Sequence, residues 1–191
     1  MTEPHASSLR DVRDHRRFDG DFPSGERFPA RVRLSFDERE GLVSLRIDGE
    51  PIGDLLSDAR RASDGYRFHD ALHMTLASKL GWSPVVRAML GRKRRSDPET
   101  DRCEDGGRAR MVEEAICHAI HVYRDELKTP DGMSRLVAHI QRMASGFEVE
   151  AISPAEWADA IAAGLEAMRA LELAGGGDLE ADFVKGDLHL V

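Results

Sequence analysis

The chain has 191 residues, 41% hydrophobic and 32% charged, and no apolar run approaches the roughly 20 residues that cross a bilayer, so we expect one soluble globular domain and no membrane partner. The net charge of −8 argues against a general nucleic-acid binder, because such proteins present a broad positive face. Two cysteines cannot form a disulfide framework, which indicates the reducing cytoplasm.

The two ends of the chain differ in character. Residues 1–28 are polar and lack hydrophobic periodicity, so we expect a disordered or loosely attached arm before a single domain over residues 29–191. At the other end, residues 146–191 carry ten acidic residues against only Arg169 and Lys185, which accounts for the whole net charge of −8.

Strand signals open the domain. Residues 31–36 alternate between apolar and polar side chains, and the alternation returns at 43–47 after the turn sequence DEREG. Asp48-Gly49 is a strong turn signal, and Pro51 suits the end of a strand or the edge of a sheet. These residues predict a β-hairpin, with or without a short third strand.

Helical signals dominate the middle of the chain. Gly81 ends one expected helix, Ser83-Pro84 opens the next, and Gly106-Gly107 marks a bend in a longer one. A further helix follows a turn at 129–132. The expected helices before that turn cover residues 53–62, 66–80, 84–90 and 98–126.

The clearest helix start lies near the end of the chain. Ser153 and Glu156 form a capping box around Pro154, and the helix that they open is stopped by the glycines at 175–177. A second hairpin is expected around Lys185-Gly186. We therefore predict an α+β fold, mainly a helical bundle, with a small antiparallel sheet formed by the N- and C-terminal hairpins.

Two histidines at helical spacing form the first candidate site. His69 and His73 are four residues apart, which places both imidazoles on one helix face, and Asp70 is adjacent in sequence. The glutamate of the HExxH motif is absent, which excludes a metalloprotease of that type. Two readings stay open: the histidines satisfy polar groups of the core, or neighbouring acids complete a metal site around them.

Four acidic residues form the second candidate set. Mg²⁺ and Mn²⁺ need several oxygen ligands, and carboxylates on facing helices can supply them. The alternative is a solvated helix face with exposed ion pairs. The residues are Glu104, Asp105, Glu113 and Glu114.

A short basic run, residues 92–95, lies between the histidines and the acids. Arginine gives bidentate hydrogen bonds to phosphate oxygens, so the run suits a triphosphate. The equally simple explanation is that these cations stabilise the negative end of the helix that Gly91 stops. Cys117 lies four residues before His121, but a cysteine inside a helix is far more often packed than catalytic.

At these same residues the chain resembles the C-terminal domain of MazG-like nucleotide pyrophosphohydrolases. The resemblance extends over about 29–191, and several separated blocks agree in order. KRRS replaces the KRKS of the family pattern, and EDGGRA replaces EDGARA. The matching blocks are DGYRFHD at 64–70, LGWSP at 80–84, KRRS at 93–96, EDGGRA at 104–109 and EEA at 113–115.

The resemblance implies nucleotide metabolism as the setting. Nothing upstream resembles the EExxE and ExxD helices that hold Mg²⁺ in MazG enzymes, so a solitary domain is expected to carry chemistry of its own or to act through another protein. The expected partners are a nucleotide or another phosphate-containing small molecule, together with a partner protein or a second copy in a homo-oligomer.

Residues and resemblance together predict a metal-dependent nucleotide (pyro)phosphohydrolase-like domain using Mg²⁺ or Mn²⁺. The alternative is a non-catalytic nucleotide-sensing or protein-interaction domain that works with a partner enzyme. The expected metal ligands are His69, Asp70, Glu104, Asp105, Glu113 and Glu114. The expected catalytic residues are His73 and Glu114, and the expected phosphate-binding residues are Arg67, Lys93, Arg94 and Arg108, the last of which can also orient an acidic ligand.

Overall fold

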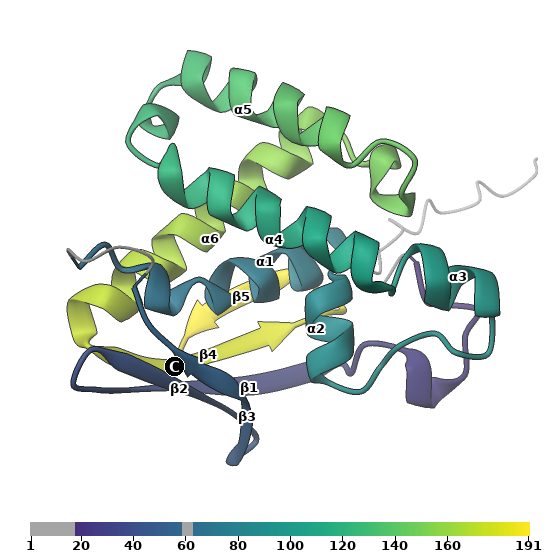
Figure 1. Ribbon diagram of the computed structural model, residues 1–191, viewed down its shortest axis with the longest axis horizontal. Helices are drawn as coiled ribbons and strands as arrows, with labels where there is room; N and C mark the ends of the chain where they lie inside the picture. The colour runs from purple at the N-terminus through teal and green to yellow at the C-terminus, as the bar shows by residue number, and fades with distance from the viewer. Residues whose placement is uncertain (1–17, 59–62) are drawn as a thin grey trace, which may run out of the picture.

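The computed structural model describes residues 18–58 and 63–191, and it confirms the predicted α+β fold. N- and C-terminal strands join in one five-stranded antiparallel sheet of order β3-β2-β1-β4-β5 (Figure 1). β1 pairs with β4, for example Leu34 with Leu179, so the two ends of the chain meet in the centre of the sheet. The strands are β1 (Arg31–Arg39), β2 (Leu42–Ile47), β3 (Glu50–Leu56), β4 (Gly176–Asp182) and β5 (Asp187–Leu190).

The helices of the described residues cover one face of this sheet in two layers, apart from α3, which lies to one side of the sheet (Figure 1). α1 and α6 pack against each other and against the C-terminal strands, and α4 and α5 form the outer layer. The helices are α1 (Asp70–Leu80), α2 (Pro84–Met89), α3 (Pro98–Cys103), α4 (Gly107–Val122), α5 (Pro130–Met143) and α6 (Pro154–Ala174). Short 3-10 turns are η1 (Ser24–Glu26), η2 (Tyr66–Phe68), η3 (Glu126–Lys128) and η4 (Glu148–Ala151).

Local capping chemistry explains where the helices begin. The side chain of Ser83 accepts a hydrogen bond from the Val86 amide at the start of α2, and Ser153 and Glu156 form the predicted capping box of α6. Asp97 caps α3 through the amides of the first turn. Thr129 caps α5, so the sequence TPDG, expected as a turn before that helix, is its first turn.

Two helix predictions are wrong. The helix expected over 53–62 is absent over its described part, because residues 50–56 form strand β3. This strand lies at the sheet edge, a position that tolerates Pro51, which has no amide hydrogen to donate. Residues 59–62 lie outside the described part of the chain. The long helix expected over 98–126 is two helices, α3 and α4, separated at Glu104–Gly106.

Residues 18–28 differ from the expected loose arm. Asp19 is fully buried and its carboxylate accepts a hydrogen bond from the Phe28 amide at 2.7 Å. Phe28 is buried as well and stacks on Phe183 at 4.8 Å between ring centroids. Asp19 and Phe28 therefore anchor this segment to the core, while its other residues are exposed or half-buried; residues 1–17 lie outside the described part.

Within residues 18–58 and 63–191, none of the helices combines the length and the apolar character that a membrane crossing requires.

The break between α3 and α4 gives a prediction about two adjacent glycines. A Cβ at Gly106 would lie 2.2 Å from the Arg102 carbonyl oxygen, whereas a Cβ at Gly107 would meet only the end of the Arg110 side chain at 3.9 Å. We expect Gly106→Ala to lower the free energy of unfolding by about 2 kcal/mol or more, because backbone must shift. Gly107→Ala should be neutral or stabilise by up to about 1 kcal/mol, because it removes backbone freedom from the unfolded chain. Urea denaturation measures both, and equal effects of the two variants would contradict the reasoning.

Candidate metal centre

The predicted site residues form two separate groups. His69, Asp70, His73, Glu113 and Glu114 gather where the start of α1 meets α4, and we name them the imidazole–carboxylate cluster. The second group, the Arg94 network, joins Arg94 to the remaining acids and to the N-terminal segment. The residues of the Arg94 network are Asp19, Arg87, Arg94, Glu104, Asp105 and Glu148.

Hydrogen bonds set the orientation of both imidazoles in the imidazole–carboxylate cluster. His69 Nδ1 lies 2.9 Å from the Tyr66 carbonyl oxygen, and His73 Nδ1 lies 2.8 Å from Glu113 Oε1. Because both partners only accept hydrogen bonds, each Nδ1 must carry the proton. The two Nε2 atoms are then the nitrogens that can bind a cation.

The free nitrogens face carboxylate oxygens. His69 Nε2 lies 3.8 Å from Asp70 Oδ1, and His73 Nε2 lies 3.4 Å from Glu114 Oε2. One ligand atom each from His69, Asp70 and His73 lie within 4.8 Å of one another. His73 Nε2 is buried and has no hydrogen-bond partner among the described residues. An unpartnered buried nitrogen beside acids is the feature that a bound cation would satisfy.

Glu113 fixes the orientation of the His73 ring and does not face its Nε2 atom. Its Oε1 accepts hydrogen bonds from His73 and from the Ser83 hydroxyl at 2.5 Å, and its Oε2 accepts one from the Val85 amide at 2.8 Å. Both oxygens are thus engaged by the protein, and the side chain is fully buried. Glu113, expected as a metal ligand, instead orients His73, as carboxylates behind metal-bound histidines do.

Charges around His73 control its protonation. Burial lowers the pKa of His73, but the neighbouring Cys117 and Glu113 outweigh burial and raise the pKa well above its ordinary value. Without a cation His73 therefore carries a proton on both nitrogens at neutral pH, and a cation that binds Nε2 must displace the proton there. Burial also raises the pKa of the Cys117 thiol, so the negative charge comes from Glu113. With its thiol neutral and buried, Cys117 is a packing residue, and it contacts His73 at 3.5 Å rather than His121.

Glu114 forms the exposed side of the cluster. Its side chain is 48% exposed, while the neighbouring Glu113 is fully buried. The His73 imidazole, whose Nε2 lies 3.4 Å from Glu114 without a well-formed hydrogen bond, lowers the pKa of Glu114, so this carboxylate stays charged at neutral pH. His69 has a lowered pKa, first because burial disfavours its charged form and then because His73 lies nearby. A neutral imidazole and a charged carboxylate are the forms in which these groups bind cations.

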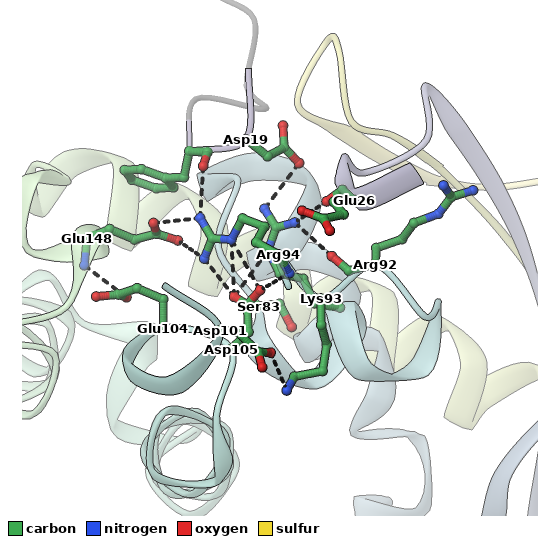
Figure 2. A network of polar contacts seen from close by, with 12 residues as sticks. Asp19, Glu26, Ser83, Arg92, Lys93, Arg94, Asp101, Glu104, Asp105 and Glu148 are labelled. Atoms are coloured by element: carbon green, nitrogen blue, oxygen red, sulfur yellow. Dashed lines mark hydrogen bonds and ion pairs between the residues drawn. The ribbon is translucent and has the colours of Figure 1, made fainter. Parts of the chain in front are cut away.

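Arg94 lies at the centre of the second group (Figure 2). Its Nη2 donates to Asp105 Oδ1 at 2.6 Å and to Glu148 Oε1 at 2.8 Å, and its Nη1 donates to Glu148 Oε2 at 2.7 Å and to the Phe18 carbonyl at 2.8 Å. Its Nε also faces Asp105, at 3.2 Å. All five donor hydrogens therefore have protein acceptors, and the side chain is buried.

The Arg94 network differs from the site that the sequence predicted. Arg94 was expected to bind phosphate and Asp105 a metal ion, yet they bind each other in the interior. Glu104 accepts a hydrogen bond from the Glu148 amide at 3.1 Å, and burial raises the pKa of its carboxyl. Neither acid belongs to the imidazole–carboxylate cluster, because Glu104 bonds the start of η4 and Asp105 bonds Arg94.

The other basic residues expected to bind phosphate lie apart from one another. Arg67 is nearly buried and binds Asp58 at 2.9 Å. Lys93 binds Asp101 at 2.6 Å. Arg108 is exposed at the start of α4, with its guanidinium 5.8 Å from the centroid of the Phe147 ring. Of these three side chains, Arg108 is the one that the structure leaves exposed to a ligand.

Three aromatic side chains beside the cluster had no role assigned from the sequence: Tyr66, His118 and His121. The Tyr66 ring stacks on His69 at 4.3 Å between centroids and meets the edges of His118 at 5.6 Å and His121 at 5.0 Å. Burial raises the pKa of Tyr66 to about 12, so the phenol stays neutral. The available signal was the spacing of Glu114, His118 and His121 on one face of a helix.

A family model provides the connection to known proteins. The model of the MazG C-terminal domain matches residues 13–191, which is nearly the whole chain and begins earlier than the resemblance seen in the sequence. No curated protein and no solved structure matches the chain. The family match points to a MazG-related role in the handling of nucleotides. Its extent shows that the chain belongs to the MazG C-terminal domain family.

Proposed function

We propose that this protein is a metal-dependent nucleotide phosphohydrolase whose cation lies between His69, Asp70 and His73. One observation carries the proposal: His73 Nε2 is buried without a hydrogen-bond partner while Nδ1 is held by Glu113. A histidine that donates from one nitrogen to a carboxylate presents the other nitrogen as a ligand once cation binding has released the second proton. The family membership supports a nucleotide as the substrate.

The donor set favours one of the two expected cations. Mg²⁺ prefers oxygen ligands and water, whereas two imidazoles with carboxylates suit Mn²⁺ and other transition cations. We therefore propose Mn²⁺ rather than Mg²⁺. When bound, such a cation lowers the pKa of a water molecule and polarises phosphoryl oxygens.

The side chains at the site have separate roles in binding the cation and in the hydrolysis. His69, Asp70 and His73 hold the cation, and Glu113 keeps His73 in the required orientation. Glu114 is charged, half exposed and adjacent to His73 Nε2, so we assign it as the general base that removes a proton from the attacking water. Arg108 remains the proposed phosphate contact because its side chain is exposed.

Titration with Mn²⁺ tests the site directly. We expect the wild-type protein to bind Mn²⁺ and to hydrolyse nucleoside triphosphates in its presence. His69→Gln should weaken Mn²⁺ binding by about 100-fold or more, since changes behind the ligands alone typically cost 10–100-fold. His139→Gln, at an exposed position of α5, is the matched control and should bind as the wild type does. Equal Mn²⁺ affinity in wild type and His69→Gln would exclude this metal centre.

One observation favours the second candidate function, a nucleotide sensor or interaction domain. Arg67 and Arg94, both expected to bind phosphate, are each neutralised by carboxylates of the protein. The two candidates differ in their products. Nucleotide binding with no product after prolonged incubation with Mn²⁺ would identify the sensor, whereas release of a nucleoside mono- or diphosphate identifies the hydrolase.

A further inference from the structure

A cleft of about 650 Å³ lies at the C-terminal end of α4, and no motif in the sequence indicated it. Its walls come from the end of α4, from η3 and the start of α5, and from the second half of α6. Small-molecule sites typically measure roughly 300–1,000 Å³ and combine apolar walls with a few polar groups. The cleft therefore has the size of a site for a molecule such as a nucleoside.

The apolar wall of the cleft suits a flat ring. Met133 from α5 and Leu165 and Met168 from α6 line the cleft. Methionine sulfur makes favourable contacts with aromatic rings, and its flexible side chain adapts to their shape. A purine or pyrimidine base has the flat, aromatic surface that such a wall binds.

The polar lining has both signs of charge. Arg124, Lys128 and Arg169 line the cleft together with acidic residues that include Asp125 and Glu166. Mixed charge does not select a polyanion, so the phosphate chain is not expected to lie inside the cleft. Carboxylates instead accept hydrogen bonds from ribose hydroxyls, and cations at the rim suit the first phosphate.

Helix α4 connects the cleft to the imidazole–carboxylate cluster. Glu114, His118 and His121 follow one face of this helix, and His121 lines the cleft. Glu114 and His121 are about 10 Å apart along the axis at 1.5 Å per residue. Tyr66 also connects the cluster to the cleft, because its ring contacts both His69 of the cluster and His121 of the cleft. An extended triphosphate can span this separation.

We propose that the cleft binds the base and ribose of a nucleoside triphosphate, whose phosphate chain follows α4 past His118 to the imidazole–carboxylate cluster. The proposal rests on the proposed function and names the part of the molecule that gives it substrate specificity. The cleft then separates nucleotides from inorganic polyphosphates, because only nucleotides carry a group that fills it.

Ala162→Trp is the variant that tests this assignment. Ala162 is exposed on α6 and lines the cleft, so an indole at this position occupies the cleft without entering the core. With ATP, GTP, CTP and UTP as probes, we expect the affinity of the best-bound nucleotide to fall about tenfold or more. Inorganic triphosphate with Mn²⁺ should bind to the variant and to the wild type equally. Ala155→Trp, an exposed position near the start of α6, is the matched control and should change neither.

The outcomes separate this inference from the proposed function. An Ala162→Trp protein that binds every nucleotide as the wild type does overturns the cleft assignment, and so does a wild-type protein that binds none of the four. Failure of the proposed function has another signature: the wild type binds no Mn²⁺ and forms no product, yet binds nucleotide with an affinity that Ala162→Trp lowers. In that case the cleft is the binding site of a sensor.

Discussion

Glu114→Gln is expected to reduce nucleotide turnover by about 10²–10⁴-fold while the protein remains folded. The magnitude is that of losing a positioned general base. Stability should change little, because Glu114 is 48% exposed and the neighbouring Glu113 keeps its buried hydrogen bonds. Steady-state kinetics with Mn²⁺ and the preferred nucleoside triphosphate measure the effect, and circular dichroism confirms the fold.

A purely structural role for Glu114 predicts a different pattern from the loss of a general base. If Glu114 is the general base, the Glu114→Gln variant should keep Mn²⁺ binding by His69, Asp70 and His73 largely intact, and the loss of turnover should appear in kcat more than in KM. Glu99→Gln, on the exposed surface of α3, is the matched control and should retain full turnover. Unchanged turnover in Glu114→Gln would remove Glu114 from the reaction.

Arg94→Met is expected to lower the free energy of unfolding by about 3–5 kcal/mol. Arg94 and Asp105 are both 1% exposed, and Glu148 is 18% exposed, so the substitution removes the bidentate cation of two carboxylates and leaves Arg87, at 3.7 Å, as the one described cation beside Asp105. Arg94→Lys should have an intermediate effect, because an ammonium keeps the charge but cannot reach both acids as the guanidinium does. Arg95→Met, the adjacent exposed position, should change stability by less than about 0.5 kcal/mol.

The pH dependence of the Arg94→Met deficit checks its cause. Burial already raises the pKa of Glu148, and removing Arg94 takes away the hydrogen bond and charge that oppose this rise. The folded variant then binds protons more tightly than the unfolded chain, so its stability falls as pH rises. Urea denaturation should show a larger deficit at pH 8 than at pH 5.5. A deficit independent of pH would mean that lost packing, not unpaired charge, causes it.

Most of the secondary structure follows from short-range signals. Ser83, Asp97 and Ser153 begin helices through hydrogen bonds to amides two or three residues away, and Gly81 and Gly175 end helices because they adopt positive φ. The third strand was expected only as a short one, and a helix was expected over 53–62. Pairing with β2 instead extends the strand to Leu56, and this pairing, not the local sequence, decides the conformation of residues 53–56.

The candidate site was predictable only in part. The spacing of His69 and His73 placed both imidazoles on one face, and the adjacent Asp70 belongs to the same cluster. The sequence does not distinguish among the four acidic residues downstream. In the structure Glu104 and Asp105 lie in the Arg94 network, whereas Glu113 and Glu114 lie beside His73. The break at Gly106 makes this division, because it redirects the chain between the two pairs.

Sequence by itself thus determined the α+β class, the capped helix ends, the joining of N- and C-terminal hairpins in one sheet, and the resemblance that the family match confirmed. Only the tertiary structure decided which charges are available to a ligand and where the cleft lies. The physical reason is that a carboxylate or guanidinium has the same local signature whether a buried partner neutralises it, as Asp105 does for Arg94, or water surrounds it. That choice depends on residues brought together from distant parts of the chain.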